Sequence, residues 1–340
     1  MVRVGRLSSM VVLTICILPT WVAAAPPLPE SWPALRARVR ADPPPEELTR
    51  GKHYILSDEH RHDLFRHDIE GLGGIFIGVG TNQNYMMAAW AQPELLVIVD
   101  FDQVIIDLHK VYRVAFLDAE TPAAFLAFWT RERSARQHAG ERIRATYRAG
   151  DERQAVMAAF NEYRPNVAWG LGEVIKRTQA LGITTFLDDP DQYAAVRRLF
   201  QEDRYLFVRG DFTGKRTLAD MGKLAGELGL AVRVLYLSNV EQYFAWGRGR
   251  FRPNMLGLPM DERSVVVRAY GWGESRTADH NYRYYVQPGQ IFHAWLRDRK
   301  FRTVRAMLAS EQATEIEGFY RLGLHPNDFQ ADDKRRRKPG

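Results

Sequence analysis

The chain has 340 residues, of which 46% are hydrophobic and 26% are charged. These proportions are those of an ordinary globular protein and exclude a disordered or collagen-like chain. The net charge of +6 is small for this length, and no basic patch alternates with aromatic residues, so we expect no nucleic-acid partner.

The first 25 residues have the features of an export signal. Arg3 and Arg6 precede an apolar core from Met10 to Ile17, and small residues at 22–25 offer a cleavage site. An uncleaved membrane anchor is the alternative, although the apolar run is short and Pro19 interrupts it. We therefore predict export to the periplasm or cell exterior, with no stable membrane span after cleavage.

The remaining chain divides into a linker, one large domain and a tail. Residues 26–50 are rich in proline, arginine and glutamate, which indicates a linker. Residues 331–340 form a basic run that indicates a disordered tail. The domain spans 51–330. Cys16 is the single cysteine and lies in the signal, so cleavage leaves no thiol for disulfides or catalysis.

A short apolar run, 75–77, begins the predicted core of this domain. Gly78 and Gly80 follow it, which is typical of a buried strand that ends in a tight turn. A helix is predicted over 83–92, capped by Thr81 or Asn82. The run LLVIVDFD that follows is apolar on both faces and predicts a central parallel strand, which completes a βαβ unit.

Residues 103–202 carry almost only helical patterns, and we interpret them as a helical insertion between the second and third core strands. After it, strands near 205–211 and 231–240 flank an amphipathic helix. Two further strands are predicted near 264–270 and 282–287. The sequence thus predicts an α/β protein with a Rossmann-like, doubly wound, mostly parallel sheet.

The turn at Gly78 and Gly80 has a physical use. Glycines let the backbone approach a ligand closely, and the amides at a helix start favour negative charge. Asp100 ends the next strand, where a carboxylate can accept hydrogen bonds from ribose hydroxyls. The dinucleotide fingerprint needs a third glycine where this chain has Gln83, which disfavours a dinucleotide. A tight turn and a helix cap without any ligand are the structural alternative.

Four stretches, FIGVGTN, VIVDFD, FVRGDFTG and YLSNVEQYF, resemble the motifs of class I S-adenosylmethionine-dependent methyltransferases. The resemblance covers 73–102 and 204 to about 270, and it implies a methyltransferase-like fold. It also implies that S-adenosylmethionine binds at Gly78, Gly80, Asn82, Asp100 and Asp211. This chain departs from the family pattern at two places. It lacks the acidic residue that usually precedes the glycines, and Asn82 stands where the family has the last glycine of the turn.

The stretch after the fourth strand corresponds to the acceptor pocket of that family. It supplies the catalytic candidates Asn239, Glu241 and Tyr243. More closely, GVGTNQNY together with YLSNVEQY resembles an uncharacterised family of exported bacterial proteins, known from leptospiral lipoproteins, with a methyltransferase-like domain. No activity is implied by this second resemblance.

Two other motifs are weaker indications of a binding site. GDFTGKRT, 210–217, resembles a phosphate loop, but Arg209 stands where that loop needs glycine, and Arg216 where it needs serine or threonine. HRHDLFRH would place His60, Asp63 and His67 on one helical face, a spacing compatible with a metal. A solvated polar face is the simpler interpretation, and we predict no metal site.

Export and methyl transfer conflict, because S-adenosylmethionine is made and used in the cytoplasm. We therefore favour an exported ligand-binding or interaction protein with a small-molecule ligand and no certain cofactor. An S-adenosylmethionine-dependent methyltransferase is the first alternative, and an exported enzyme of other chemistry is the second. The sequence does not predict the oligomeric state.

Overall fold

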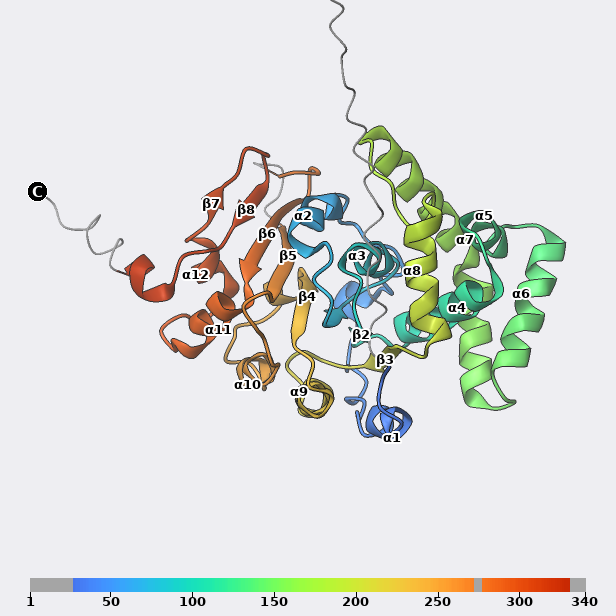
Figure 1. Cartoon of the computed structure of the whole chain (residues 1–340), viewed down its shortest axis with the longest axis horizontal. Coiled ribbons are helices and arrows are strands. Elements are labelled where there is room, and N and C mark those ends of the chain that lie inside the picture. The colour runs from blue at the N-terminus through green and yellow to red at the C-terminus, as the bar shows by residue number, and fades with distance from the viewer. Residues whose placement is uncertain (1–26, 272–276, 331–340) are drawn as a thin grey trace, which may run out of the picture.

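The computed structural model describes residues 27–271 and 277–330. The predicted signal peptide and the basic tail lie outside the described residues. A central sheet is covered by helices on both faces, and a helical region extends beyond one of its edges (Figure 1). Within the described ranges, no helix is long and apolar enough to cross a membrane.

Eight strands form the sheet. They are β1 (Ile75–Gly78), β2 (Leu95–Asp100), β3 (Tyr205–Arg209), β4 (Val232–Ser238), β5 (Val265–Gly271), β6 (Tyr282–Pro288), β7 (Gln312–Ala313) and β8 (Phe319–Arg321). The α-helices are α1 (Trp32–Ala37), α2 (Arg66–Ile69), α3 (Gln83–Ala91), α4 (Gln103–Asp118), α5 (Pro122–Phe128), α6 (Arg133–Thr146), α7 (Asp151–Ala180), α8 (Pro190–Gln201), α9 (Thr217–Leu228), α10 (Phe251–Leu256), α11 (Gly289–Arg297) and α12 (Val304–Leu308).

The strand order is β3-β2-β1-β4-β5-β6-β8-β7. Strands β1 to β5 are parallel, whereas β6 is antiparallel to β5, and β7 is antiparallel to β8. The predicted α/β class with a mostly parallel sheet is confirmed, and it is compatible with a Rossmann-like fold. The order reverses between β1 and β4, and ligands of open α/β sheets bind at the carboxyl ends of the strands beside such a reversal.

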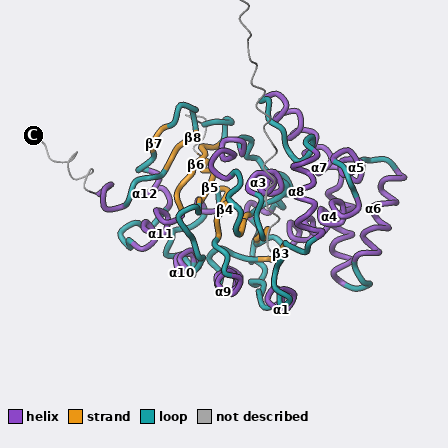
Figure 2. The backbone as a smooth tube through the Cα atoms, viewed as in Figure 1, coloured by secondary structure: helices purple, strands orange, loops and turns teal. Residues whose placement is uncertain are grey.

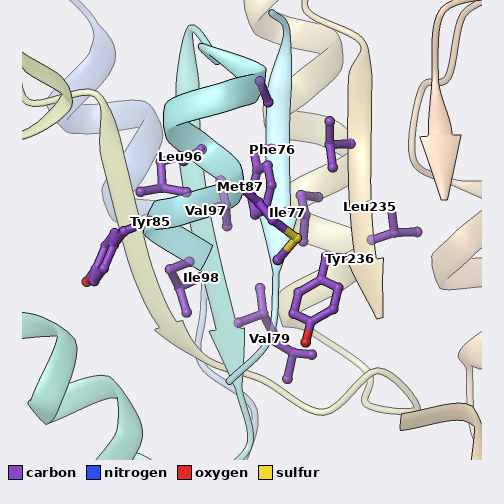
Figure 3. Packing of buried hydrophobic residues seen from close by; sticks show 14 of the residues in the cluster. Phe76, Ile77, Val79, Tyr85, Met87, Leu96, Val97, Ile98, Leu235 and Tyr236 are labelled. Carbon is purple, nitrogen blue, oxygen red and sulfur yellow. The ribbon is translucent and has the colours of Figure 1, made fainter. Parts of the chain in front are cut away.

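The centre of the sheet is apolar because its strands are covered on both faces. Every residue of β1, β2 and α3 is buried. Figure 3 shows Met87 of α3 beside Phe76 and Ile77 of β1, while Tyr85 points to the opposite side of the helix. Burial on all sides explains why the sequence of α3 has almost no polar face.

Helices α4 to α8 lie between β2 and β3 and form the region beyond the β3 edge, where Figure 2 shows almost only helix. Two of these helices begin where a capping residue precedes proline. Thr121 Oγ1 accepts from the Ala124 amide, and Asp189 Oδ1 accepts from the Asp191 and Gln192 amides. Tyr112 of α4 packs against Trp129 in an aromatic core, with ring centroids 4.7 Å apart and the rings tilted by 48°.

The N-terminal segment, 27–50, packs on the domain. Trp32 of α1 is buried, and its Nε1 donates to the Asp203 carbonyl oxygen at 2.8 Å. Arg40 forms an ion pair with Asp220 of α9 at 2.7 Å, and the Asp42 side chain is also buried. These contacts are not expected for a linker. The composition of a segment does not show which distant residues it will contact.

Candidate functional site at the carboxyl edge of the sheet

The turn after β1 uses its own amide groups internally. Gly80 has a φ of +84°, a conformation that favours glycine. Its amide donates to Asp100 Oδ2 at 3.1 Å, and the Thr81 amide donates to Gln83 Oε1 at 3.0 Å. Two amides that could attract an anionic ligand therefore already have acceptors within the chain.

The space beside the two glycines is also filled from within. A Cβ at Gly78 would collide with the Asn84 side chain, and one at Gly80 would collide with Gln83. Asn84 Nδ2 donates to the carbonyl oxygens of Val79 at 3.0 Å and Thr81 at 2.9 Å. The glycines thus make room for two side chains of the following helix.

A buried histidine supports the turn from behind. His109 Nε2 lies 2.7 Å from the Gly80 carbonyl oxygen, which can only accept, so Nε2 carries the proton. Nδ1 then accepts from the Tyr85 hydroxyl at 2.6 Å. Burial lowers the pKa of His109 to about 4, so the ring is neutral at physiological pH and its role is positional.

Asp100 connects the turn to the next strand end. Its Oδ1 accepts from the Asp102 amide at 2.9 Å, and its Oδ2 accepts from Gly80. Burial raises the pKa of Asp100 to about 7, and the backbone donors only partly oppose this effect. The residue placed by resemblance on a ribose instead bonds to the chain's own backbone.

The raised pKa predicts a pH dependence of stability. The folded chain holds the Asp100 proton more tightly than the unfolded chain, so this contribution is complete at acid pH and is lost as pH rises through about 7. We expect the free energy of unfolding to fall with a slope approaching about 1.4 kcal/mol per pH unit between about pH 4 and pH 7.

Urea denaturation at several pH values measures this slope. Asp100→Asn should flatten it, whereas Asp211→Asn, which alters an exposed carboxylate, should not. An equal slope in the wild type and Asp100→Asn would contradict the assignment.

A covering segment, residues 52–62, crosses the carboxyl ends of the strands. His53 Nδ1 lies 2.7 Å from Asp102 Oδ2, just after β2, and Asp58 Oδ2 accepts from the Tyr282 hydroxyl at 2.9 Å at the start of β6. Tyr282 pairs with the last residue of β5, so both anchors lie on the same edge of the sheet. The segment therefore lies over the edge where α/β sheets bind ligands.

Glu59 fixes the middle of the covering segment to β4. It is 1% exposed and accepts from the Tyr236 hydroxyl at 2.8 Å and from the Ser238 hydroxyl. His62 Nε2 lies 3.0 Å from the Tyr236 hydroxyl and 3.3 Å from Glu59. His62 thus contacts Glu59 and Tyr236 rather than Ser238, which differs from the nucleophile–base order of covalent catalysis.

Ser238 has a φ of +49°, unusual for a residue with a side chain, and a register shift precedes it in β4. Such backbone persists only where its surroundings fix it, here through the bond to Glu59.

The catalytic candidates converge only in part, since the side chains of Asn239 and Tyr243 interact while Glu241 lies apart. Asn239 Nδ2 donates to the Tyr282 hydroxyl at 3.3 Å, and Tyr243 is 49% exposed. Glu241 is buried, lies 2.8 Å from Arg268 Nε, and accepts from Trp246 Nε1 at 2.9 Å. These contacts give Glu241 a structural place in the core.

The structure brings together only some of the residues that were expected to bind a cofactor. Gly78, Gly80 and Asp100 form the turn, and the buried Asn82 side chain accepts from the Thr81 hydroxyl at 3.3 Å. Asp211 follows the neighbouring strand β3, but its exposed carboxylate bonds to Thr213 in its own turn.

The sequence that resembles a phosphate loop does hold an anion, supplied by the chain itself. The Asp42 carboxylate accepts from the amides of Lys215 at 3.1 Å and Arg216 at 3.0 Å. It also lies within 3.3 Å of the Asp211 amide and 3.4 Å of the Thr217 amide. The start of α9 is therefore occupied by the N-terminal segment.

The histidine-rich stretch does not form one helical face. A 3-10 turn covers 62–65 and α2 covers 66–69, while Asp63 pairs with Arg61 at 2.9 Å. In the part of the chain that the structure describes, no group of three His, Cys, Asp or Glu side chains could hold a metal ion.

Sequence reasoning missed Asp42, Glu59 and His109. A signal existed for His109, because Ile105, Ile106 and Tyr112, one turn away on the same helix, are apolar or aromatic. Asp42 and Glu59 lie in irregular segments, and their partners are more than 160 residues away, so no local pattern marks them.

The comparison with protein families gives one match, over residues 54–323, to a family described as a domain of unknown function (DUF7790). This region contains the sheet, the turn and most of the covering segment. Among curated proteins, none matches the chain. Because the match spans most of its length, the chain belongs to the DUF7790 family of domains of unknown function.

Proposed function

We propose that the protein is an exported ligand-binding or interaction protein on a methyltransferase-like frame, and that it does not use S-adenosylmethionine. The observation that carries this proposal is the closed turn. The amides of Gly80 and Thr81 have internal acceptors, and Gln83 and Asn84 fill the space beside the glycines. The covering segment adds a second layer over the same edge.

A methyltransferase is the second candidate, and the arrangement of three strand ends favours it. Gly80 and Asp100 are hydrogen-bonded, and the amide of Gly210, next to Asp211, donates to the Asp100 carbonyl oxygen at 2.9 Å. Opening the turn would be needed before a cofactor could use these groups, since Asp100 would have to release Gly80.

Calorimetric titration with S-adenosylmethionine and S-adenosylhomocysteine distinguishes the two candidates. We expect no binding heat for the full chain, because ligand contacts would have to replace internal hydrogen bonds at no net gain. Micromolar binding that Asp100→Ala abolishes would instead support the methyltransferase candidate.

Export is tested separately. A phosphatase reporter fused after Ala25 should be active outside the cytoplasm, as the signal-like N-terminus predicts. A reporter that is expressed but inactive there would contradict export.

A further inference from the structure

A cavity of about 390 Å³ lies between α6 and α7, far along the chain from the closed turn. Arg133, Arg136 and Arg144 of α6 line one side, and Met157, Phe160 and Asn161 of α7 line the other. The residues recur at steps of three, four and eight, so each helix contributes one face. In Figure 1, α6 lies at the outer end of the helical region, away from the sheet, and α7 runs beside it and back toward the middle of the molecule.

Arg164 of α7 lies next to this cavity. It is a buried arginine, 7% exposed, and one of its nitrogens, Nη1, has no hydrogen-bond partner among the described residues. Its guanidinium lies over the ring of Phe160, 5.7 Å from the centroid, and this ring lines the cavity. One turn of α7 separates Arg164 from Asn161, so Arg164 lies close to the cavity without lining it.

One acid lies beside the cavity, since Glu141 Oε1 accepts at 3.0 Å from Gln137, which lines the cavity. The arginines around the cavity are not paired with it. Arg131, Arg133, Arg136, Arg144 and Arg164 form no ion pair within the described ranges 27–271 and 277–330. Burial and the charges of Arg136 and Arg131 lower the pKa of Arg164. Arg136 has one polar contact, from Nη2 to Asn161 Oδ1 at 3.4 Å.

The start of α6 adds to the positive potential. No acidic residue lies in its first turn, and the preceding Glu132 makes no capping bond. The free amides of a helix start attract anions, and here they lie beside Arg133. A buried guanidinium with an unpartnered nitrogen destabilises a fold, and an anion in the neighbouring cavity would offset the charge of Arg164.

We propose that the cavity between α6 and α7 binds a phosphorylated molecule, with Arg133 and Arg136 of its lining holding the phosphate and Arg164, behind the Phe160 ring, adding positive charge. Arginine guanidinium groups bind phosphate through paired hydrogen bonds. The cavity is larger than a phosphate group, and Met157 and Phe160 offer apolar surface to the rest of the molecule. This chemistry fits a soluble phosphate ester and a lipid phosphate headgroup alike.

Two probes separate these sources for the full chain. Calorimetry with inorganic pyrophosphate tests the soluble form, and co-sedimentation with phosphatidylcholine vesicles, with and without phosphatidic acid, tests the lipid form. Binding to either probe supports the site and identifies its source. Binding to neither would overturn it.

Variants locate the binding. Arg136→Gln should weaken it about tenfold, because a charge-assisted hydrogen bond is lost. Arg148→Gln removes the same charge from an exposed position outside the cavity and should change the affinity less than about twofold. Equal losses in the two variants would show non-specific attraction and overturn the proposal.

Arg164→Met tests the buried arginine. The readout is the stabilisation by a bound probe, which would not change if Arg164 had only a structural role. We expect the thermal midpoint to stay equal or rise, because the buried charge is removed, while stabilisation by the bound probe becomes smaller. A lower midpoint with unchanged probe binding would assign Arg164 to the core alone. The exposed Arg136 variant keeps the site testable if Arg164→Met fails to fold.

This site is independent of the closed turn. Binding of S-adenosylmethionine would refute the proposed absence of that cofactor without affecting the proposal for the cavity. A failure of both phosphate probes would refute the cavity proposal without affecting the proposal that the turn is closed.

Discussion

Asp42→Ala is expected to lower the free energy of unfolding by about 3 kcal/mol, since it strips a buried cluster of amides of its acceptor. The carboxylate is 2% exposed and accepts from the loop that begins α9, with its shortest bonds to Arg216 and Lys215. Gly214 packs directly against the carboxylate, so the carboxylate is enclosed by the chain. Chemical denaturation followed by tryptophan fluorescence measures the change.

Two controls sharpen this test. Asp42→Asn keeps one acceptor oxygen and should lose less than Asp42→Ala. Asp211→Ala removes an exposed carboxylate from the same loop and should cost under about 1 kcal/mol. A loss below about 1 kcal/mol for Asp42→Ala would mean that the N-terminal segment is not held by this carboxylate.

Glu241→Gln is expected to destabilise the fold by about 3–5 kcal/mol, because it leaves a buried arginine charge uncompensated. Arg268 is 1% exposed and is surrounded by Glu241 at 2.8 Å, Gln287 at 2.9 Å and the ring of Phe292. Burial raises the pKa of Glu241 despite the neighbouring Arg268, which indicates how strongly this pair is desolvated.

A double substitution separates a structural pair from a catalytic base. Glu241→Met combined with Arg268→Met should recover most of the lost stability, because apolar side chains can replace a buried ion pair. If Glu241→Gln leaves the denaturation midpoint unchanged, the ion pair contributes little, and Glu241 returns as a candidate base.

The parts of the fold that local chemistry determines were predictable. Runs of branched apolar residues indicate β1 and β2, and a proline after a capping residue indicates the starts of α5 and α8. Gly229 ends α9 with a φ of +65°, as a glycine cap does. Each of these signals lies within a few residues of the feature that it determines.

The closure of the candidate site was not predictable, because it depends on contacts between distant segments. The sequence showed that Gln83 replaces a glycine, but not that its side chain would turn back to Thr81. The segment around Glu59 has no regular period, so nothing local indicates that it crosses β4. The short strands β7 and β8 pair at the far edge of the sheet and have equally weak local signals.

Amide hydrogen exchange at Gly80 and Thr81, followed by nuclear magnetic resonance, tests the closed turn most directly. We predict slow exchange at both amides in the free protein, because Asp100 and Gln83 already accept from them. We also predict no change when S-adenosylhomocysteine is added. Fast exchange in the free protein, slowed by that ligand, would show an open cofactor site and contradict the proposed function.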